Sequence, residues 1–279
     1  MNQLPGGSGG QNFNRNTIAA SHRLEAAPEI ERGGTLLSPN KEIESGTLRC
    51  AVVRHVEIED LGYLGEGLQR GGVEVDYIDA WDLPTEPVPD AAGLVVLGGP
   101  MAVYEIDRHP YLAREIELIR RYIHQDRPVL GVCLGAQLLA AAGGARVYPG
   151  AEGKEIGWFP VELTAGGRED PLWAGFPTSF TTFHWHGDTF DLPAGAELLA
   201  RSDRYPQSFR IGRHAYGVQF HPEIVPTALE SWIRAYRLEL ARERLDAEDV
   251  LAVPDLQAHR ALATRFGKNV ATWMHRAQG

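Results

Sequence analysis

A single cysteine separates an apolar strand-like run from an apolar helix-like run, and this junction constrains the fold more than any other segment. Residues 128–137 read Pro-Val-Leu-Gly-Val-Cys-Leu-Gly-Ala-Gln. The run Val129 to Val132 is typical of a short buried strand, and Leu138 to Ala142 of the start of a helix. Cys133 lies between them, with a glycine two residues away on each side. The pattern predicts a sharp strand–turn–helix connection with the cysteine side chain pushed out of a sheet.

Two interpretations of Cys133 follow from this placement. A helix that begins just after the cysteine brings backbone N–H groups and a positive dipole end near the sulfur, which favours the thiolate. The alternative is a structural cysteine on a core strand, because free cysteine is among the most buried residue types. The junction by itself does not separate a nucleophile from a core residue.

A second strand end supplies the groups that a cysteine nucleophile needs. Residues 216–223 form an apolar run that ends in His221, and Glu223 follows two residues later. A thiol needs a base to accept its proton, and the imidazole needs a carboxylate to fix its tautomer. Pro222 restricts the backbone between the two side chains. Together the two strand ends predict a Cys133–His221–Glu223 catalytic triad.

Two further blocks accompany the triad segments. Residues 97–104 read Leu-Gly-Gly-Pro-Met-Ala-Val-Tyr, and residues 186–188 read His-Gly-Asp. With the cysteine and histidine segments, these blocks resemble the class I (triad-type) glutamine amidotransferases. Within that family the chain is similar to the free-standing branch related to the amidotransferase domain of GMP synthase. The resemblance covers Leu48 to Ile224, with the four blocks in the family's order.

The resemblance implies a reaction and a set of site residues. The Cys133 thiolate would attack the side-chain amide of glutamine and form a γ-glutamyl thioester, while the backbone N–H groups of Gly99 and Leu134 stabilise the oxyanion. Met101 stands where many relatives have glycine, and its backbone would contact glutamine. The other residues implied to line the glutamine pocket are Gln137, Trp185, Gly187 and Asp188.

Apolar runs along the chain predict the fold class. Strand-like runs at 48–56, 73–79, 93–98, 127–132 and 145–148 alternate with helical patterns such as Pro110 to His124. Alternation of this kind indicates parallel strands with helices on both faces. Closer runs at 155–163, 180–186, 196–201, 207–211 and 215–220 indicate antiparallel additions. We therefore expect an α/β fold with a mostly parallel, doubly wound central sheet and additional antiparallel strands.

The chain is predicted to have one folded domain preceded by an extension. Residues 1–47 show no sustained hydrophobic period and are predicted to be disordered. Residues 48–279 are predicted to form the amidotransferase-like domain, with C-terminal helices from about residue 226. Leu229 to Leu240 and Leu256 to Trp273 show helical spacing of apolar residues.

Two further sequence patterns are too weak to predict a binding site. Gly62, Gly65 and Gly67 follow the first strand, but their spacing differs from the dinucleotide-binding fingerprint, and acidic residues lie where a pyrophosphate would approach. His184 and His186 share one face of a predicted strand, with Asp188 nearby. Zinc needs three or four ligands, however, and no further cluster of ligating residues lies nearby in the sequence. We predict no metal and no cofactor.

Composition bounds the partners. With only two cysteines no disulfide framework is implied, and no segment approaches the roughly 20 apolar residues of a membrane helix. A net charge of −10 argues against nucleic acid. We expect a cytoplasmic enzyme that takes glutamine or another γ-glutamyl amide. Three roles stay open: a glutaminase with a separate synthetase subunit, a stand-alone γ-glutamyl hydrolase or peptidase, and a non-catalytic regulatory module.

Overall fold

The computed structural model describes residues 47–279, so nearly all of the predicted N-terminal extension lies outside the described residues. The strands are β1 (Leu48–Arg54), β2 (Val73–Asp79), β3 (Gly93–Val96), β4 (Val129–Val132), β5 (Val147–Pro149), β6 (Glu155–Leu163), β7 (Ser179–His186), β8 (Asp188–Phe190), β9 (Glu197–Arg201), β10 (Pro206–Ile211) and β11 (Ala215–Val218). The helices are α1 (Gly62–Arg70), α2 (Tyr111–His124), α3 (Leu134–Ala142), α4 (Ala165–Glu169), α5 (Pro226–Ala235), α6 (Arg237–Glu243), α7 (Ala247–Leu251) and α8 (Leu256–Arg276), with short 3₁₀ turns at Ala80–Asp82 and Pro171–Trp173.

A mixed sheet forms the centre of the molecule. Its strand order is β2-β1-β3-β4-β11-β10-β9-β6-β7. The strands β2, β1, β3, β4 and β11 run parallel to one another, and β10, β9, β6 and β7 extend the sheet from β11 by antiparallel pairing. The predicted combination of a parallel sheet with antiparallel additions is confirmed.

The membership of the parallel part differs from the prediction at two strands. The run at 145–148 was expected to join it, but β5 pairs with β8 in a separate two-stranded antiparallel sheet. Its place in the parallel part is taken by β11, which lies directly beside β4. Residues in β5 are half-buried or exposed whereas all of β11 is buried, but apolar character alone does not reveal which strand a segment will pair with.

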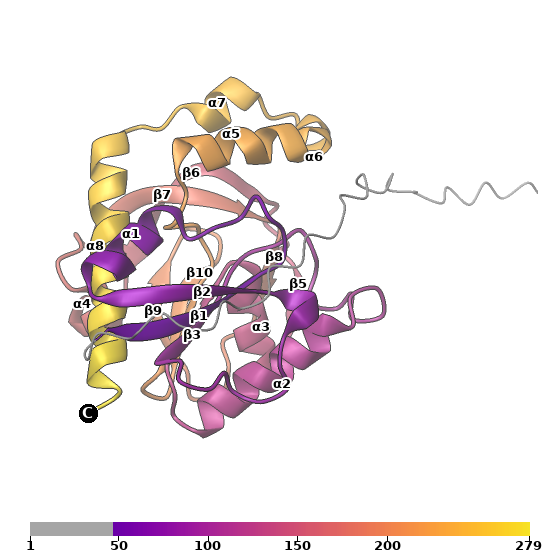
Figure 1. The fold of residues 1–279 in the computed structure, drawn as a ribbon. Coiled ribbons are helices and arrows are strands. Elements are labelled where there is room, and N and C mark those ends of the chain that lie inside the picture. The colour runs from indigo at the N-terminus through magenta and orange to yellow at the C-terminus, as the bar shows by residue number, and fades with distance from the viewer. Residues whose placement is uncertain (1–46) are drawn as a thin grey trace, which may run out of the picture. The chain divides into compact units, whose positions relative to one another are not determined.

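Both faces of the parallel strands are buried, which explains their nearly continuous apolar sequences. In β1, Cys50 and Val52 belong to the core on one face, and Ala51 and Val53 to the core on the other. Helices α1 and α8 cover the first face, and α2 and α3 cover the second (Figure 1).

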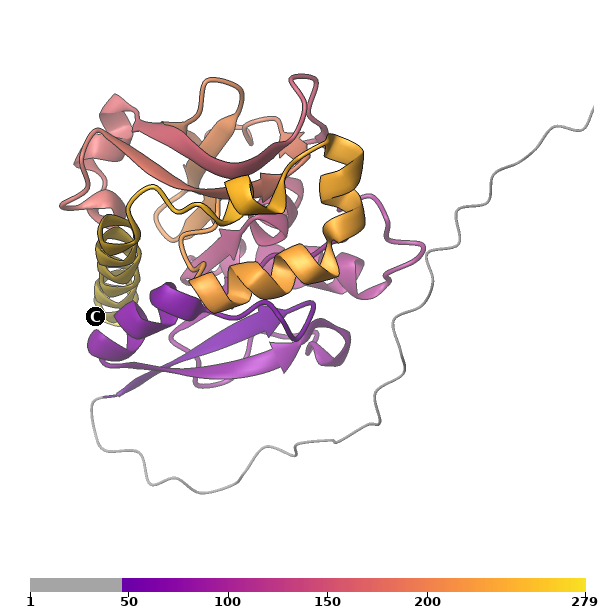
Figure 2. The same ribbon diagram turned by 90° about the horizontal axis from the view of Figure 1, so that it is seen from above.

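The chain returns over the antiparallel strands in three short helices. Together α5, α6 and α7 pack on β6 and β7 through a third apolar cluster that includes Phe183, Leu229 and Trp232. They lie at the top of the described domain in Figure 1 and in front of the sheet in the view from above (Figure 2). The single helix predicted for Leu229 to Leu240 is interrupted at Tyr236, whose φ of −106° and ψ of 22° separate α5 from α6. Within residues 47–279 no helix has the length and apolar character to span a membrane.

Candidate active site

The cysteine junction has the predicted strand–turn–helix geometry. Cys133 connects β4 to α3 with φ 51° and ψ −106°, a conformation that residues with a side chain rarely adopt. The flanking glycines are required for close packing rather than for positive φ. A Cβ on Gly131 would lie 2.2 Å from the Gly135 carbonyl oxygen, and a Cβ on Gly135 would lie 2.0 Å from that of Val96. The two glycines therefore let α3 approach β4 and β3 directly below the cysteine.

The histidine and glutamate predicted as triad members form a buried pair just beyond β11. His221 Nδ1 lies 2.6 Å from Glu223 Oε1, and each residue is 3% exposed. The His221 backbone N–H donates to the Phe183 carbonyl at 2.8 Å, which ties this segment to β7. Because Nδ1 faces the carboxylate, it carries a proton, and Nε2 is left for the substrate side.

Cys133 and His221 line the same cavity, and both lie next to Gly98: a Cβ placed on that glycine would be 3.6 Å from Cys133 Cβ and 3.2 Å from His221 Cε1. The Cys133 Sγ also lies 3.7 Å from the carbonyl oxygen of Trp185. Burial lowers the pKa of His221, but the negative charges of Glu223 and Cys133 outweigh burial and raise this pKa well above its ordinary value. The site therefore favours the protonated form of His221.

The cavity has a volume of about 360 Å³, within the range of small-molecule sites. Every residue assigned above to the oxyanion hole or to the glutamine pocket lines it: Gly99, Met101, Leu134, Gln137, Trp185, Gly187 and Asp188. Glu223 lies behind His221. The structure thus places all predicted site residues in one cluster, although they come from four separate stretches of sequence.

Gln137 ties two sides of the cavity together. Its Nε2 lies 3.3 Å from the Asp188 carbonyl oxygen and 3.3 Å from Gln219 Oε1. The Asp188 carboxylate accepts a hydrogen bond from Tyr104 Oη at 3.4 Å. The segment that contains Asp188 is therefore fixed to α3 by its backbone and to the loop after β3 by its side chain.

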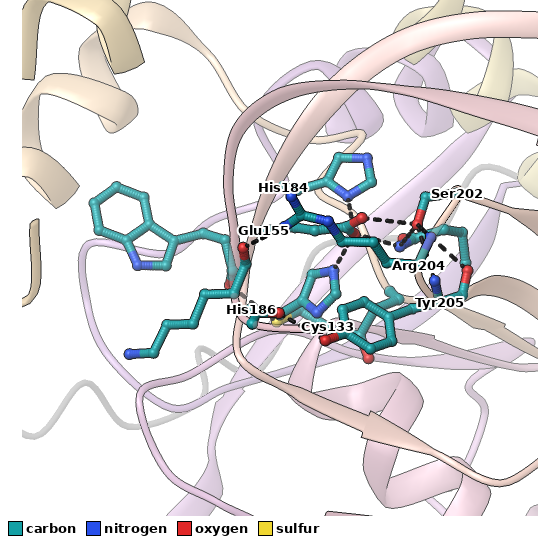
Figure 3. A network of polar contacts seen from close by, with 12 residues as sticks. Cys133, Glu155, His184, His186, Ser202, Arg204 and Tyr205 are labelled. Carbon is teal, nitrogen blue, oxygen red and sulfur yellow. Dashed lines mark hydrogen bonds and ion pairs between the residues drawn. The ribbon is translucent and has the colours of Figure 1, made fainter. Parts of the chain in front are cut away.

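A buried polar network holds the end of β7 beside Cys133 (Figure 3). Glu155 Oε2 accepts hydrogen bonds from His184 Nδ1 at 3.0 Å, His186 Nε2 at 3.1 Å and Gln207 Nε2 at 2.7 Å. Ser202 Oγ donates to Glu155 Oε1 at 2.8 Å. Burial raises the pKa of Glu155, but these donors outweigh burial and lower this pKa, so the carboxylate stays charged.

The same network contains a group of three side chains that could hold a metal ion. Atoms of Glu155, His184 and His186 lie within 4.8 Å of one another. Each histidine already directs a ring nitrogen at the Glu155 carboxylate, and burial lowers the pKa of His184 to about 4. Asp188, grouped with the histidines in the sequence, contributes only a backbone oxygen, 3.2 Å from His186 Nδ1. We interpret the cluster as a hydrogen-bonded support for the Trp185 segment.

Among the cavity residues that the sequence did not predict are Glu59, Trp232 and Tyr236. Glu59 is 5% exposed, and burial raises its pKa to about 7. Trp232 packs edge-on against His221, with ring centroids 4.8 Å apart. Tyr236 Oη donates to Glu59 Oε1 at 3.5 Å. One signal was available for Glu59, since it follows a buried strand at the sheet edge where Cys133 lies; Trp232 and Tyr236 come from helices far along the chain.

Glu59 and His221 approach the same glycine, Gly98. A Cβ placed on Gly98 would lie 2.7 Å from Glu59 Oε2 and 3.2 Å from His221 Cε1, so both groups contact the same glycine. Glu59 Oε2 itself is buried and has no hydrogen-bond partner among the described residues. A buried carboxylate in this position can accept a hydrogen bond from a ligand in the cavity.

Comparisons with known proteins agree with the site. The family model for class-I glutamine amidotransferases matches residues 66–236. The glutamine amidotransferase-like protein YfeJ of Salmonella typhimurium is 36% identical over 205 residues, which cover 70% of this chain and 83% of YfeJ. A GMP synthase of Thermomicrobium roseum is 42% identical over 142 residues, 50% of this chain but only 25% of the synthase. A solved glutamine amidotransferase of Thermotoga maritima superposes with a TM-score of 0.73 at 35% identity, covering 80% of this chain and 98% of that one.

Proposed function

This chain belongs to the class I glutamine amidotransferases, and on that basis we propose that it hydrolyses the side-chain amide of glutamine to glutamate and ammonia. The observation that carries the proposal is the position of Cys133. It lies on a strained turn and lines a cavity of suitable size together with His221, whose ring is paired with Glu223. This is the arrangement that nucleophilic amide cleavage requires.

The proposed reaction has two halves. The Cys133 thiolate attacks the amide carbon, and the protonated His221 gives its Nε2 proton to the leaving nitrogen, so that ammonia departs and a γ-glutamyl thioester remains. His221 then takes a proton from water, which attacks the thioester and releases glutamate and the thiolate. Glu223 holds the imidazole in one tautomer throughout, because its carboxylate faces Nδ1.

Two backbone N–H groups are proposed as oxyanion donors. Leu134 is the first residue of α3, and the first N–H groups of a helix have no partner within it. Gly99 lines the cavity in the loop after β3. We assign the amino-acid end of glutamine to the part of the cavity formed by Met101, Gln137, Trp185, Gly187 and Asp188.

The use of the ammonia is a separate proposal. The match to GMP synthase spans only a quarter of that enzyme, so an ammonia acceptor would lie outside the matched region. We propose a separate synthetase subunit as partner. Its addition should raise the glutaminase kcat of this chain, whereas an enzyme that acts alone should show no stimulation by any added protein.

A stand-alone γ-glutamyl hydrolase is a second candidate, favoured by the extent of the cavity. Beyond His221 the lining continues to Glu59, Trp232 and Tyr236. His221 must face the leaving nitrogen, so a substituent on that nitrogen would lie toward these residues. A γ-glutamyl amide with a larger leaving group has room there.

Steady-state hydrolysis tests both candidates. The purified chain should release ammonia and glutamate from glutamine, and Cys133→Ala should lower kcat by several orders of magnitude. Cys50→Ala is the matched control, because Cys50 is buried and burial raises its pKa to about 12. Far faster cleavage of γ-glutamyl dipeptides than of glutamine would favour the hydrolase, and no turnover of either would favour a non-catalytic module.

A further inference from the structure

A buried histidine contacts the loop after β3 that contains Gly98 and the proposed oxyanion donor Gly99. His55 follows β1, and its side chain is fully buried together with that of Glu115 on α2. His55 Nδ1 lies 2.7 Å from the Gly98 carbonyl oxygen. On the other side of the ring, Nε2 lies 3.0 Å and 3.1 Å from the two carboxylate oxygens of Glu115. Neither residue belongs to the triad or lines the cavity.

The two contacts define where the protons of His55 lie. A carbonyl oxygen only accepts hydrogen bonds, so Nδ1 must donate to Gly98. With Nε2 directed at a carboxylate, the ring is held as an imidazolium paired with Glu115. Burial lowers the pKa of His55, but the hydrogen bond and charge of Glu115 outweigh burial and raise this pKa.

The contact with Gly98 determines the direction of the neighbouring N–H group. The Gly98 carbonyl and the Gly99 N–H belong to one peptide unit, and in a trans peptide they point to opposite sides. A Cβ on Gly99 would lie 2.9 Å from His55 Cβ, and a Cβ on Gly98 would lie 3.6 Å from Cys133 Cβ. The peptide is therefore held between His55 and Cys133, with its carbonyl toward His55 and its N–H directed away from it.

We propose that His55, held by Glu115, is a positioning residue that fixes the Gly98–Gly99 peptide with its N–H toward the oxyanion. This inference rests on the proposed function. It assigns a role to a buried ion pair that would otherwise be hard to explain, since taking two charges out of water is unfavourable unless they are well paired. The preorganised peptide needs no reorientation when the oxyanion forms, which is where such donors contribute most.

Kinetics separate positioning from general support of the fold. His55→Ala should lower kcat for glutamine by about 10- to 100-fold, less than or comparable to loss of one oxyanion donor, with little change in KM. Alkylation of Cys133 by iodoacetamide needs the thiolate but no oxyanion hole, so its rate should stay within about twofold of wild type. His55→Asn should recover much of the kcat, because its side-chain amide can still donate to Gly98.

Glu115 provides a second test on the opposite side of the ring. Glu115→Gln keeps a hydrogen-bonding group near Nε2 but removes the charge, so kcat should fall less than in His55→Ala. Glu117→Gln is the matched control, because Glu117 lies on the same helix but forms an exposed ion pair with Arg120. It should leave kcat unchanged.

Three results would overturn the inference. The first is a His55→Ala enzyme with wild-type kcat, and the second is a His55→Ala enzyme whose kcat and Cys133 alkylation rate fall together. The third comes from NMR of protein with ¹⁵N-labelled histidine, which needs no turnover: both ring nitrogens of His55 should be protonated at pH 7, and an unprotonated Nδ1 contradicts the proposal. An inactive wild-type chain with a doubly protonated His55 would instead count against the proposed function alone.

Discussion

At Cys133 the backbone adopts a conformation that would suit glycine better than cysteine. Positive φ in a residue with a Cβ stores on the order of 1–3 kcal/mol, and here it occurs at the proposed nucleophile. The turn lies in tightly packed backbone, because Gly131 and Gly135 let α3 approach β4 and β3 closely on either side of it. The strain directs the sulfur into the cavity.

This strain gives a stability prediction. Cys133→Gly should be at least as stable as Cys133→Ala, and by up to about 1–2 kcal/mol more stable, because glycine relieves the strain that alanine retains. Ala136→Gly, within α3 at ordinary helical geometry, is the control and should lose about 1 kcal/mol. Chemical denaturation measures all three variants. A Cys133→Gly protein clearly less stable than Cys133→Ala would show that the turn is unstrained.

Glu59 gives a prediction about pH. In the folded protein its pKa is about 7, against 4.5 for an ordinary glutamate, so between these values folding takes up a proton and stability falls as pH rises. Glu59→Gln removes this penalty. Its stability relative to wild type should increase between pH 4.5 and 7.5, by on the order of 2–3 kcal/mol. The exposed Glu57→Gln is the control. A stability difference that does not vary with pH would contradict the raised pKa.

At the scale of elements, two glycines of α1 let this helix pack closely against other segments, one of which carries Glu223 of the proposed triad. A Cβ on Gly62, whose φ is +38°, would lie 2.0 Å from the Glu223 carbonyl oxygen. A Cβ on Gly67 would lie 2.4 Å from the Thr264 carbonyl oxygen and 2.6 Å from the Gly267 Cα on α8. Two of the three glycines that weakly resembled a dinucleotide site, Gly67 and Gly62, therefore serve close packing, against α8 and against the segment that carries Glu223.

The two faces of α1 give a matched pair of variants. Gly67→Ala should destabilise the protein by about 2–3 kcal/mol, because the new methyl would meet backbone atoms of α8 that cannot move aside. At Gly65 the same methyl would meet only Leu61 Cβ, at 3.0 Å. Gly65→Ala should be neutral or gain up to about 1 kcal/mol from helix propensity. Equal thermal melting temperatures for the two variants would argue against this packing.

Sequence patterns predicted where strands and helices lie along the chain better than they predicted which segments contact one another. The apolar runs and turn residues placed most strand ends and the junction at Cys133, because these features depend on local chemistry. They could not show that β11 lies beside β4, which brings His221 to the same sheet edge as Cys133. Nor could they show that Glu155 meets His184, because 29 residues separate these two side chains. Contacts of this kind depend on packing across the whole domain.

At the scale of the whole molecule, the site lies where the parallel strands end and the C-terminal helices return. Helix α6 contributes Glu239, which pairs with Lys154 Nζ at 2.5 Å and accepts from Trp185 Nε1 at 3.0 Å. All of these residues line the cavity. The helical end of the domain is thus part of the site wall, and we expect its removal to abolish activity as well as to reduce stability.

The N-terminal residues 1–46 should be dispensable for activity and for stability. A protein that begins at Thr47 should keep its kcat and its melting temperature within about 2 °C, because residues 1–46 show no apolar face to bury. Differential scanning calorimetry and the glutaminase assay check this. Loss of several degrees on truncation would show that the extension packs on the domain.

Covalent labelling with a chloroketone analogue of glutamine tests the central claim most directly. The analogue should be drawn to the cavity by its amino-acid end and alkylate the nucleophile that attacks the amide carbon. Peptide mapping by mass spectrometry should find one equivalent of label on Cys133 and none on Cys50, with protection by excess glutamine. Label on Cys50, or on neither cysteine, would contradict the assignment of Cys133 as the nucleophile of a glutamine-hydrolysing site.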